Sequence, residues 1–431
     1  MLALLLVLQG PVSPATEPPD SLPRITLTEA LQRAAQLDPN YVAAIGQVDN
    51  AVWARRSAFS VFILPSISLA TTATRNNPPF FNFGTLRPEK YAVQGTITAS
   101  YDLFTGGQKL AELSRSGAAL ESAHAGELKQ RFATALLTES DYYGVLAAAE
   151  LDRVARERLR RAREQLAVAR ARVSSGAAVQ TDSLNLRLEL NHAQVAQLEQ
   201  QSALRIARLE LGRRVGSEGP VDAAPLDSAP APELPITLAD AITQAATQGP
   251  SYRQAAADER AAAAVYRSRL GAYLPHATLS WTGVGFDNKF VPSGAKFTQL
   301  SIGVTLPLWD NAHREIALSQ ARVSRDVARA IRNDMERAVQ HDVTAAYDAY
   351  ETTRASVGLS AEALAAARES FRIQQTRYQS GATTILDLVD AEVNLSQAEA
   401  DYVAARYGTR LALAGLETIL GKRLFTDKEP Q

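Results

Sequence analysis

Residues 25–44 read ITLTEALQRAAQLDPNYVAA, and residues 236–255 read ITLADAITQAATQGPSYRQA. The two stretches lie 211 residues apart (236 − 25). Later pairs keep nearly the same spacing: Leu64-Pro65 with Leu274-Pro275 at 210, then Leu103-Phe104 with Leu308-Trp309, Gly176 with Gly381, Asp182 with Asp387 and Gly216 with Gly421 at 205. Because this register is held over more than a hundred residues, the sequence indicates two copies of one structural unit.

The repeat predicts the domain organisation. We expect a signal peptide over 1–15, a first repeat over 16–216, a proline-rich linker over 217–235, a second repeat over 236–421 and a tail over 422–431. The signal peptide is inferred from the apolar run Leu2 to Leu8 and the small residues that follow it through Ala15. The alternative for this run is the apolar stub of a cytosolic protein.

Composition excludes several classes of function. Lys and Arg total 45 against 46 Asp and Glu, so no bulk charge favours nucleic acid. With no cysteine there is no disulfide, thiolate metal site or cysteine nucleophile. The five histidines lack metal-ligand spacing, and no Ser/His/Asp grouping, phosphate loop or dinucleotide fingerprint is present. We therefore expect no enzyme activity, no cofactor and no metal site.

Each repeat has the same order of expected elements. A helical stretch (26–60 and 237–272) precedes two segments with period-two alternation, which is typical of strands with one apolar face. The expected strands are Ile67 to Ala73, Val93 to Leu103, Thr278 to Phe286 and Leu300 to Leu308. The hairpin connections contain Pro78, Pro79, Phe80, Phe81 and Phe83 in the first repeat, and Phe290, Pro292 and Gly294 in the second.

A very long helix follows each hairpin, over 107–173 and 311–378. At 1.5 Å per residue each would extend roughly 100 Å. Apolar residues recur every seven positions at Val343, Tyr350, Val357, Leu364, Phe371 and Tyr378, and in the first repeat at Val145, Leu159, Leu166 and Val173, with Asp152 interrupting. This heptad pattern predicts a left-handed coiled coil.

The strands and the helices suit different surroundings. No stretch beyond Leu8 approaches the roughly 18 apolar residues of a transmembrane helix. In lipid every backbone polar group needs a partner, so a membrane sheet must close, and four strands cannot close by themselves. Closure therefore requires several copies of the chain. The long helices are too polar for lipid and must stand in water.

A short pattern occurs twice, as Arg172-Val-Ser-Ser-Gly176 with Thr181-Asp182 and as Arg377-Tyr-Gln-Ser-Gly381 with Asp387 and Asp390. Each copy of this tip pattern lies where a long helix is expected to reverse. With these two copies, the doubled arrangement from Ile25 to Gly421 resembles the TolC family of outer-membrane factors. The resemblance implies a mainly α protein with a small β part. Its long coiled-coil helices would form a periplasmic tunnel, and four strands from each of three chains would form one outer-membrane β-barrel of twelve strands (3 × 4).

The implied function is the passive exit duct of a tripartite efflux system. Its partners would be two further copies of the chain, a periplasmic adaptor, an inner-membrane pump of the RND or ABC type, and outer-membrane lipid, with no nucleic acid. An exit channel for type I protein secretion is the alternative within this class. A coiled-coil structural protein of the envelope is the alternative from another class.

Asp387 and Asp390 lie three residues apart on one helix face. Thr384-x-x-Asp387 fits a capping box, a purely local role that Asp182 could also have. The resemblance implies a second role at the tunnel constriction, where three chains would place six carboxylates (2 × 3) in one ring. Such a ring repels anions and favours cations, divalent ions included.

The resemblance also implies how the tip is held closed. Tyr378 and Asp182 match a tyrosine–aspartate link, and Thr181 matches one partner of a second link whose arginine is replaced here by Thr383. Arg172, Gly176, Arg377 and Gly381 form the expected adaptor-docking tips, and both glycines also fit left-handed helix caps. The charged latch is missing, which leaves the closure of the tip unexplained by sequence.

Arginines crowd one part of the first long helix: Arg153, Arg156, Arg158, Arg160, Arg161, Arg163, Arg170 and Arg172. Acidic residues alternate with them, which argues against nucleic-acid binding. We expect a solvated face with pairs formed within the helix.

Overall fold

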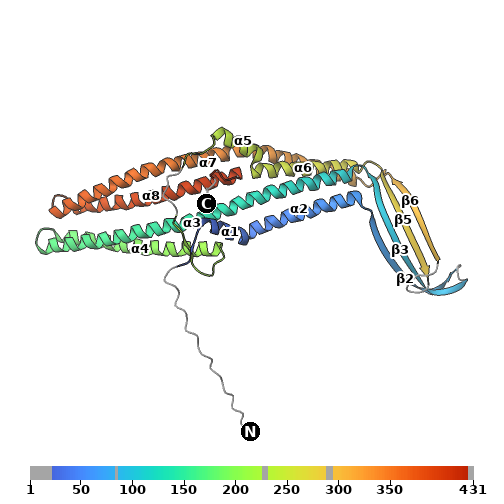
Figure 1. Cartoon of the computed structure of the whole chain (residues 1–431), viewed down its shortest axis with the longest axis horizontal. Helices are drawn as coiled ribbons and strands as arrows, with labels where there is room; N and C mark the ends of the chain where they lie inside the picture. Colours follow the sequence, from blue (N-terminus) through green and yellow to red (C-terminus); the bar gives the residue numbers. More distant parts are fainter. Residues whose placement is uncertain (1–21, 83–85, 226–231, 288–294, 426–431) are drawn as a thin grey trace, which may run out of the picture. The chain divides into compact units, whose positions relative to one another are not determined.

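The computed structural model describes residues 22–82, 86–225, 232–287 and 295–425 (Figure 1). The predicted signal peptide lies outside the described residues, as do Phe83, Phe290, Pro292 and Gly294. The chain divides into two compact units, and each takes segments from both repeats. The tip unit comprises residues through Ala34, Thr138–Pro230 and Gly358–Tyr407; the sheet unit comprises Ala35–Leu137, Ala231–Val357 and Gly408–Gln431.

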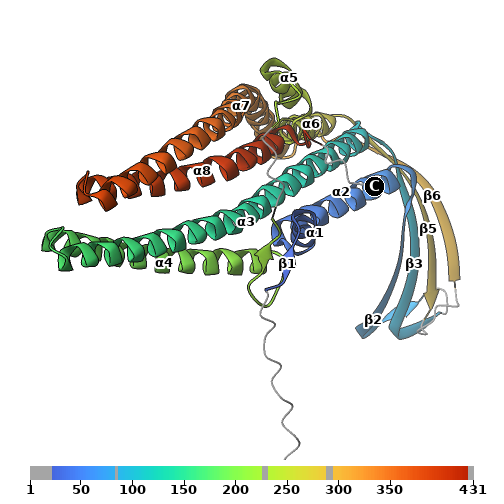
Figure 2. The same cartoon turned by 60° about the vertical axis from the view of Figure 1, so that its left-hand side comes forward.

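Four antiparallel strands form the main sheet of the sheet unit. They are β2 (Ser66–Asn82), β3 (Arg87–Thr105), β5 (His276–Asp287) and β6 (Ala295–Thr305), in the order β2-β3-β5-β6 (Figure 2). Each repeat supplies one hairpin, and the hairpins join where β3 pairs with β5. The prediction of four strands per chain is confirmed.

The two faces of this sheet differ in chemistry. Ile67, Ala99, Trp281 and Leu300 lie opposite one another across all four strands, so their side chains share one face. The preceding or following residue on each strand is a serine, and the row Ser66, Ser100, Ser280 and Ser301 faces the other way. Within it the Ser66 and Ser100 hydroxyls are 2.8 Å apart, and those of Ser280 and Ser301 are 2.9 Å apart. The sheet thus has one apolar and one hydroxyl-rich face.

All four strands differ from their predicted bounds, and β3 and β6 begin at Arg87 and Ala295 rather than Val93 and Leu300. β2 continues through Phe81, where a connection was expected, and its pairing register shifts between Arg75 and Phe80. The two prolines in that interval have no N–H to donate to the ladder, which accounts for the irregularity. β6 ends at Thr305 rather than Leu308. Pro307 likewise has no N–H with which to extend the pairing.

Each of the first helical stretches is two helices. α1 (Leu27–Leu37) and α2 (Pro39–Ile63) are separated at Asp38, whose carboxylate accepts the Asn40 amide at 2.9 Å. α5 (Leu238–Gln248) and α6 (Pro250–Gly271) are separated at Gly249. The sequence predicted one helix in each place. The break follows from Pro39 and Pro250, because proline suits the first position of a helix and disrupts its interior.

The long helices are α3 (Gln108–Ser174) and α7 (His313–Ser380). Each reverses into a second long helix, α4 (Gln180–Arg214) or α8 (Ile385–Leu420), which lies beside it in both views. The heptad series of α7 is buried at Val343, Tyr350, Leu364, Phe371 and Tyr378, whereas Val357 is half-buried. No described helix is both long and apolar enough to cross a membrane.

The linker contains a short strand that the sequence did not predict. β4 (Asp222–Ala223) pairs in parallel with β1 (Arg24–Ile25) in the tip unit. Next to this pair the buried hydroxyl of Tyr142 donates to the Ala224 carbonyl at 2.7 Å. A strand of two residues is too short to show alternating hydrophobicity, so β1 and β4 could not be predicted from the sequence.

Candidate functional site

Both helix reversals of the tip unit end in the same cap. Gly176 and Gly381 have φ angles of 78° and 80°. The amide of Ala177 donates to the Arg172 carbonyl at 2.8 Å, and that of Ala382 donates to the Arg377 carbonyl at 2.7 Å. These six-to-one bonds with a left-handed glycine define Schellman caps, so the predicted structural role of both glycines is confirmed.

The Thr384–Asp387 pair forms the capping box predicted at the start of α8. The Asp387 amide donates to the Thr384 hydroxyl at 3.2 Å, and the Asp387 carboxylate accepts the Thr384 amide at 3.1 Å. The hydroxyls of Thr384 and Thr383 donate to the same carboxylate oxygen at 2.7 Å and 2.8 Å. These bonds, with that from the Thr384 side chain foremost, lower the pKa of Asp387. Asp387 is therefore a fixed, ionised group.

The other predicted tip residues lie near their helix starts. Asp390 is exposed one turn beyond Asp387 on α8. Asp182 is half-buried in the first turn of α4, and Thr181 beside it is exposed. The N-cap residue of α4 is Val179, whose side chain makes no capping hydrogen bond. The equivalent position in the second repeat is Thr384, whose side chain does. The two repeats therefore share a fold at the tip but not its side-chain chemistry.

Tyr378 is buried at the end of α7, with an exposed fraction of 3%. Within the described residues its hydroxyl finds no hydrogen-bond partner. Burial raises the pKa of Tyr378, and the charge of Asp182 raises it further. Asp182 thus acts on Tyr378 through its charge, but within the described residues no hydrogen bond forms the expected tyrosine–aspartate link.

The two motif arginines make different contacts. The Arg377 guanidinium donates to the Ala382 carbonyl at 3.2 Å, inside its own reversal. Arg172 has the equivalent bond to Ala177 at 3.4 Å, and it also donates to the Tyr378 carbonyl of the other hairpin. This second contact joins residues 206 apart in sequence.

The prediction for the arginine-rich part of α3 is correct for some residues and wrong for others. Arg160 pairs with Glu157 and Glu164 within the helix, as expected. Arg161, however, is 13% exposed and donates to Glu392 of α8 at 3.0 Å, and Arg158 contacts Glu189 of α4 at 2.6 Å. These arginines face neighbouring helices rather than water. Their partners are too distant in sequence for spacing to have indicated them.

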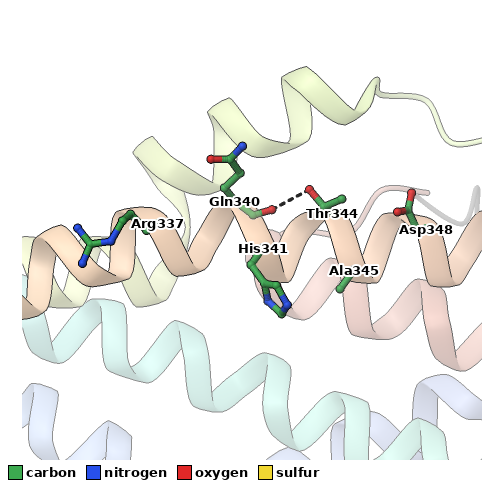
Figure 3. Close-up of a pocket in the computed structure, with 6 residues that line it drawn as sticks. All are labelled: Arg337, Gln340, His341, Thr344, Ala345 and Asp348. Atoms are coloured by element: carbon green, nitrogen blue, oxygen red, sulfur yellow. Dashed lines mark hydrogen bonds between the residues drawn. The ribbon is translucent and has the colours of Figure 1, made fainter.

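A shallow hollow of about 450 Å³ lies along α7 in the sheet unit, and all six residues that line it come from that helix (Figure 3). The Thr344 hydroxyl donates to the Gln340 carbonyl at 2.7 Å, and His341 lies 2.9 Å from Asp342. This arrangement contains no nucleophile with a base. Across the described ranges, no three His, Cys, Asp or Glu side chains are grouped to hold a metal ion.

A family model described as "Outer membrane efflux protein" matches residues 30–217 and 241–422, which are most of both repeats. The chain belongs to this family. Its members are transport proteins of the outer membrane rather than enzymes, so the predicted family, localisation and absence of enzyme activity are confirmed.

Curated and solved relatives agree with this assignment. The pyoverdine export outer membrane protein OpmQ of Pseudomonas aeruginosa is 26% identical over 351 residues, covering 77% of this chain and 70% of OpmQ. The CmeC outer membrane channel of Campylobacter jejuni superposes with a TM-score of 0.80 at 15% identity, over 94% of this chain and 87% of CmeC. The outer membrane protein VceC of Vibrio cholerae superposes with a TM-score of 0.77 at 18% identity, over 93% of this chain and 97% of VceC. These structures establish the predicted fold.

Proposed function

We propose that three copies of this chain form a passive exit channel in the outer membrane for the cargo of an inner-membrane pump. The main support is the sheet with two unlike faces. Ile67 and Leu300 on its apolar face are 73% and 69% exposed, which suits contact with lipid. The serine row on the opposite face suits a water-filled interior.

The edges of the sheet favour an oligomer. In the four-strand order, β2 and β6 each have a sheet partner on one side only. Inside a membrane their outer backbone groups require partners, which a second copy supplies through its own edge strand. Three copies give twelve strands (3 × 4), the number implied by the resemblance to the TolC family.

The helix α4 offers a second surface for contact between copies. Its exposed apolar residues recur at helical spacing: Leu184, Leu188, Val195, Leu198, Ile206 and Leu209. A long apolar stripe exposed to water on a helix indicates a surface that another protein buries. We propose that a neighbouring copy of the chain buries it.

The helix reversals form the periplasmic end of the proposed duct. Asp387 and Asp390 from three chains supply the constriction ring, and Asp182, Thr181 and Tyr378 lie beside it. Arg172, Gly176, Arg377 and Gly381 shape the surface to which the adaptor docks. Cargo and pump class, RND or ABC, are set by the partner machinery. Type I protein secretion would use the same duct.

Fractionation and mass measurement test the channel assembly. We expect the protein in the outer-membrane fraction, released only by detergent, with a native mass of three chains. Recovery as a detergent-independent monomer would instead support the coiled-coil scaffold. N-terminal sequencing of the same material tests the proposed removal of residues 1–15 before the two repeats at 16–216 and 236–421.

Cross-linking tests adaptor docking, since the chain has no cysteine of its own. Cysteines at the exposed positions Ser175 and Ser380 should cross-link to the co-expressed adaptor, whereas a cysteine at Phe81 in the sheet should not. Equal cross-linking at all three positions would refute docking at the reversals. We prefer the serines to the adjacent glycines, because the positive φ of a glycine cap disfavours any side chain.

A further inference from the structure

Arg172 occupies the same motif position as Arg377 but makes contacts that Arg377 does not. Each guanidinium donates to a carbonyl of its own reversal, at 3.4 Å for Arg172 and 3.2 Å for Arg377. Among the described residues, only Arg172 also contacts the opposite hairpin. Two copies of one motif have therefore acquired different roles.

Three observations place Arg172 against the end of α7. Its Nη1 donates to the Tyr378 carbonyl. Its guanidinium carbon lies 4.9 Å from the centre of the Tyr378 ring, within the range of a cation–π contact. A Cβ added to Gly381 would lie 3.2 Å from Nη2, whereas one added to Gly176 would meet nothing within 4 Å. The C-terminal end of a helix, where Tyr378 lies in α7, carries partial negative charge, which strengthens the attraction for a cation.

We propose that Arg172 is a latch that ties the two hairpin tips of one chain together and holds the closed tip in place of the charged link that Thr383 cannot make. Its gating role rests on the proposed channel function, whereas the tie between hairpins does not. Tyr378 takes part through its ring and its carbonyl. Its hydroxyl, which has no partner in the described structure, is not needed.

Separation of the hairpins would break the carbonyl bond and the ring contact at the same time. Arginine suits this role because its planar guanidinium can donate to a carbonyl while it stacks on a ring. Lysine keeps the charge but lacks the planar group. Arg172→Lys should therefore give an intermediate effect, and it also serves if Arg172→Ala folds poorly.

The tie is tested by a distance measurement that needs no pore. Spin labels on Ser174→Cys and Gln379→Cys report the separation of the two tips, with labelled chains diluted by unlabelled ones so that distances within one chain dominate. Arg172→Ala should lengthen or broaden the distance distribution. Arg377→Ala is the matched control and should leave it unchanged. Identical distributions for the parent protein and Arg172→Ala, or equal changes in both variants, would overturn the proposal.

The gating role is tested by conductance in planar bilayers. Arg172→Ala should raise the ratio of open to closed states on the order of tenfold, the size expected for the loss of one charge-assisted hydrogen bond. Tyr378→Phe should resemble the parent protein, and Tyr378→Leu, which removes the ring contact but keeps the backbone carbonyl, should lie between the parent protein and Arg172→Ala. Opening by Tyr378→Phe as large as that by Tyr378→Leu would assign the closed state to the hydroxyl and refute the latch. If no protein conducts but the distances still respond to Arg172, the channel proposal fails and the tie between hairpins stands.

Discussion

Asp387 has an observed structural role and a proposed functional one. The capping box fixes its carboxylate, and the same hydrogen bonds keep it ionised. The structural role was predictable, because the spacing Thr384-x-x-Asp387 is local. The proposed constriction role depends on three chains, so it could be inferred only from the resemblance to the TolC family.

Neutralising the proposed constriction ring should alter ion selectivity. We expect Asp387→Asn with Asp390→Asn to weaken cation selectivity in bilayer recordings, because the carboxylates of the ring are removed. Asp401→Asn, an exposed aspartate further along α8, is the control and should leave selectivity unchanged. Unaltered selectivity in the double variant would show that the constriction lies elsewhere.

The pH dependence of selectivity follows from the lowered pKa of Asp387. A carboxyl whose pKa is depressed in the folded protein stays charged below the usual aspartate value of about 3.9 and loses its charge only as the pH falls through the depressed value. The contribution of Asp387 to selectivity should therefore persist at about pH 4. Loss of selectivity well above that pH would contradict this assignment.

The Arg161–Glu392 pair is the clearest feature that the sequence did not reveal. Glu392 is 1% exposed, and its burial raises its pKa more than the Arg161 charge lowers it. Its partner is 231 residues away, and neither residue belongs to a recognisable motif. Only the packing of α3 against α8 brings the two together.

Removing one partner of this pair should be costly. Arg161→Met leaves the buried Glu392 carboxylate without its hydrogen-bonded partner, although Arg158 still acts on it through its charge. The change should destabilise the protein by about 3–5 kcal/mol, whereas Arg161→Met with Glu392→Leu should recover most of the loss. Since a raised carboxyl pKa favours folding most when the group is protonated, the defect of Arg161→Met should grow as the pH rises above about 4.3. Thermal unfolding in detergent, followed by circular dichroism, measures both effects. A pH-independent defect would contradict them.

The two reversals also allow a matched comparison of glycines. An alanine at Gly176 or Gly381 must adopt a positive φ, at a cost of about 1–2 kcal/mol. At Gly381 the new Cβ also crowds Arg172. Gly381→Ala should therefore lower the unfolding temperature more than Gly176→Ala does, and this difference should disappear in an Arg172→Ala background. A difference that persists would have another cause.

At the scale of elements, periodicity predicted most of the fold. Heptads indicated the long helices, and alternation indicated all four strands of the main sheet, because each pattern extends over many residues. The ends of the strands were less accurate. β2 and β6 end at Asn82 and Thr305, where prolines affect the pairing, and β3 and β6 begin at Arg87 and Ala295, five or six residues before the predicted starts. β1 and β4 are too short to have a period and were missed.

The alternation of the strands gives a test in which neighbouring residues serve as each other's control. Leu300 and Ser301 are adjacent on β6 and lie on opposite faces of the sheet. Leu300→Arg should impair membrane insertion, since a charge facing lipid costs about 2–4 kcal/mol near the bilayer centre. Ser301→Arg should insert normally. The measurement is the amount of each variant in the outer-membrane fraction. Less Ser301→Arg than Leu300→Arg in that fraction would show that the serine face, not the leucine face, contacts lipid.

At the scale of the whole molecule, the internal repeat and the family pattern together predicted the class of protein. The trimer, the adaptor and the pump are not properties of one chain, so they stay proposals that rest on the sheet edges, the α4 stripe and the helix reversals. In this proposal the nature of the cargo depends on the partners. The residues of the proposed constriction determine only which ions and molecules pass through it.

Conductance of the purified protein in planar bilayers tests the central claim most directly. The account predicts discrete, cation-selective conductance steps from material whose native mass is three chains. Pure, folded trimer that inserts into bilayers without conducting would contradict the account, as would conductance from single chains.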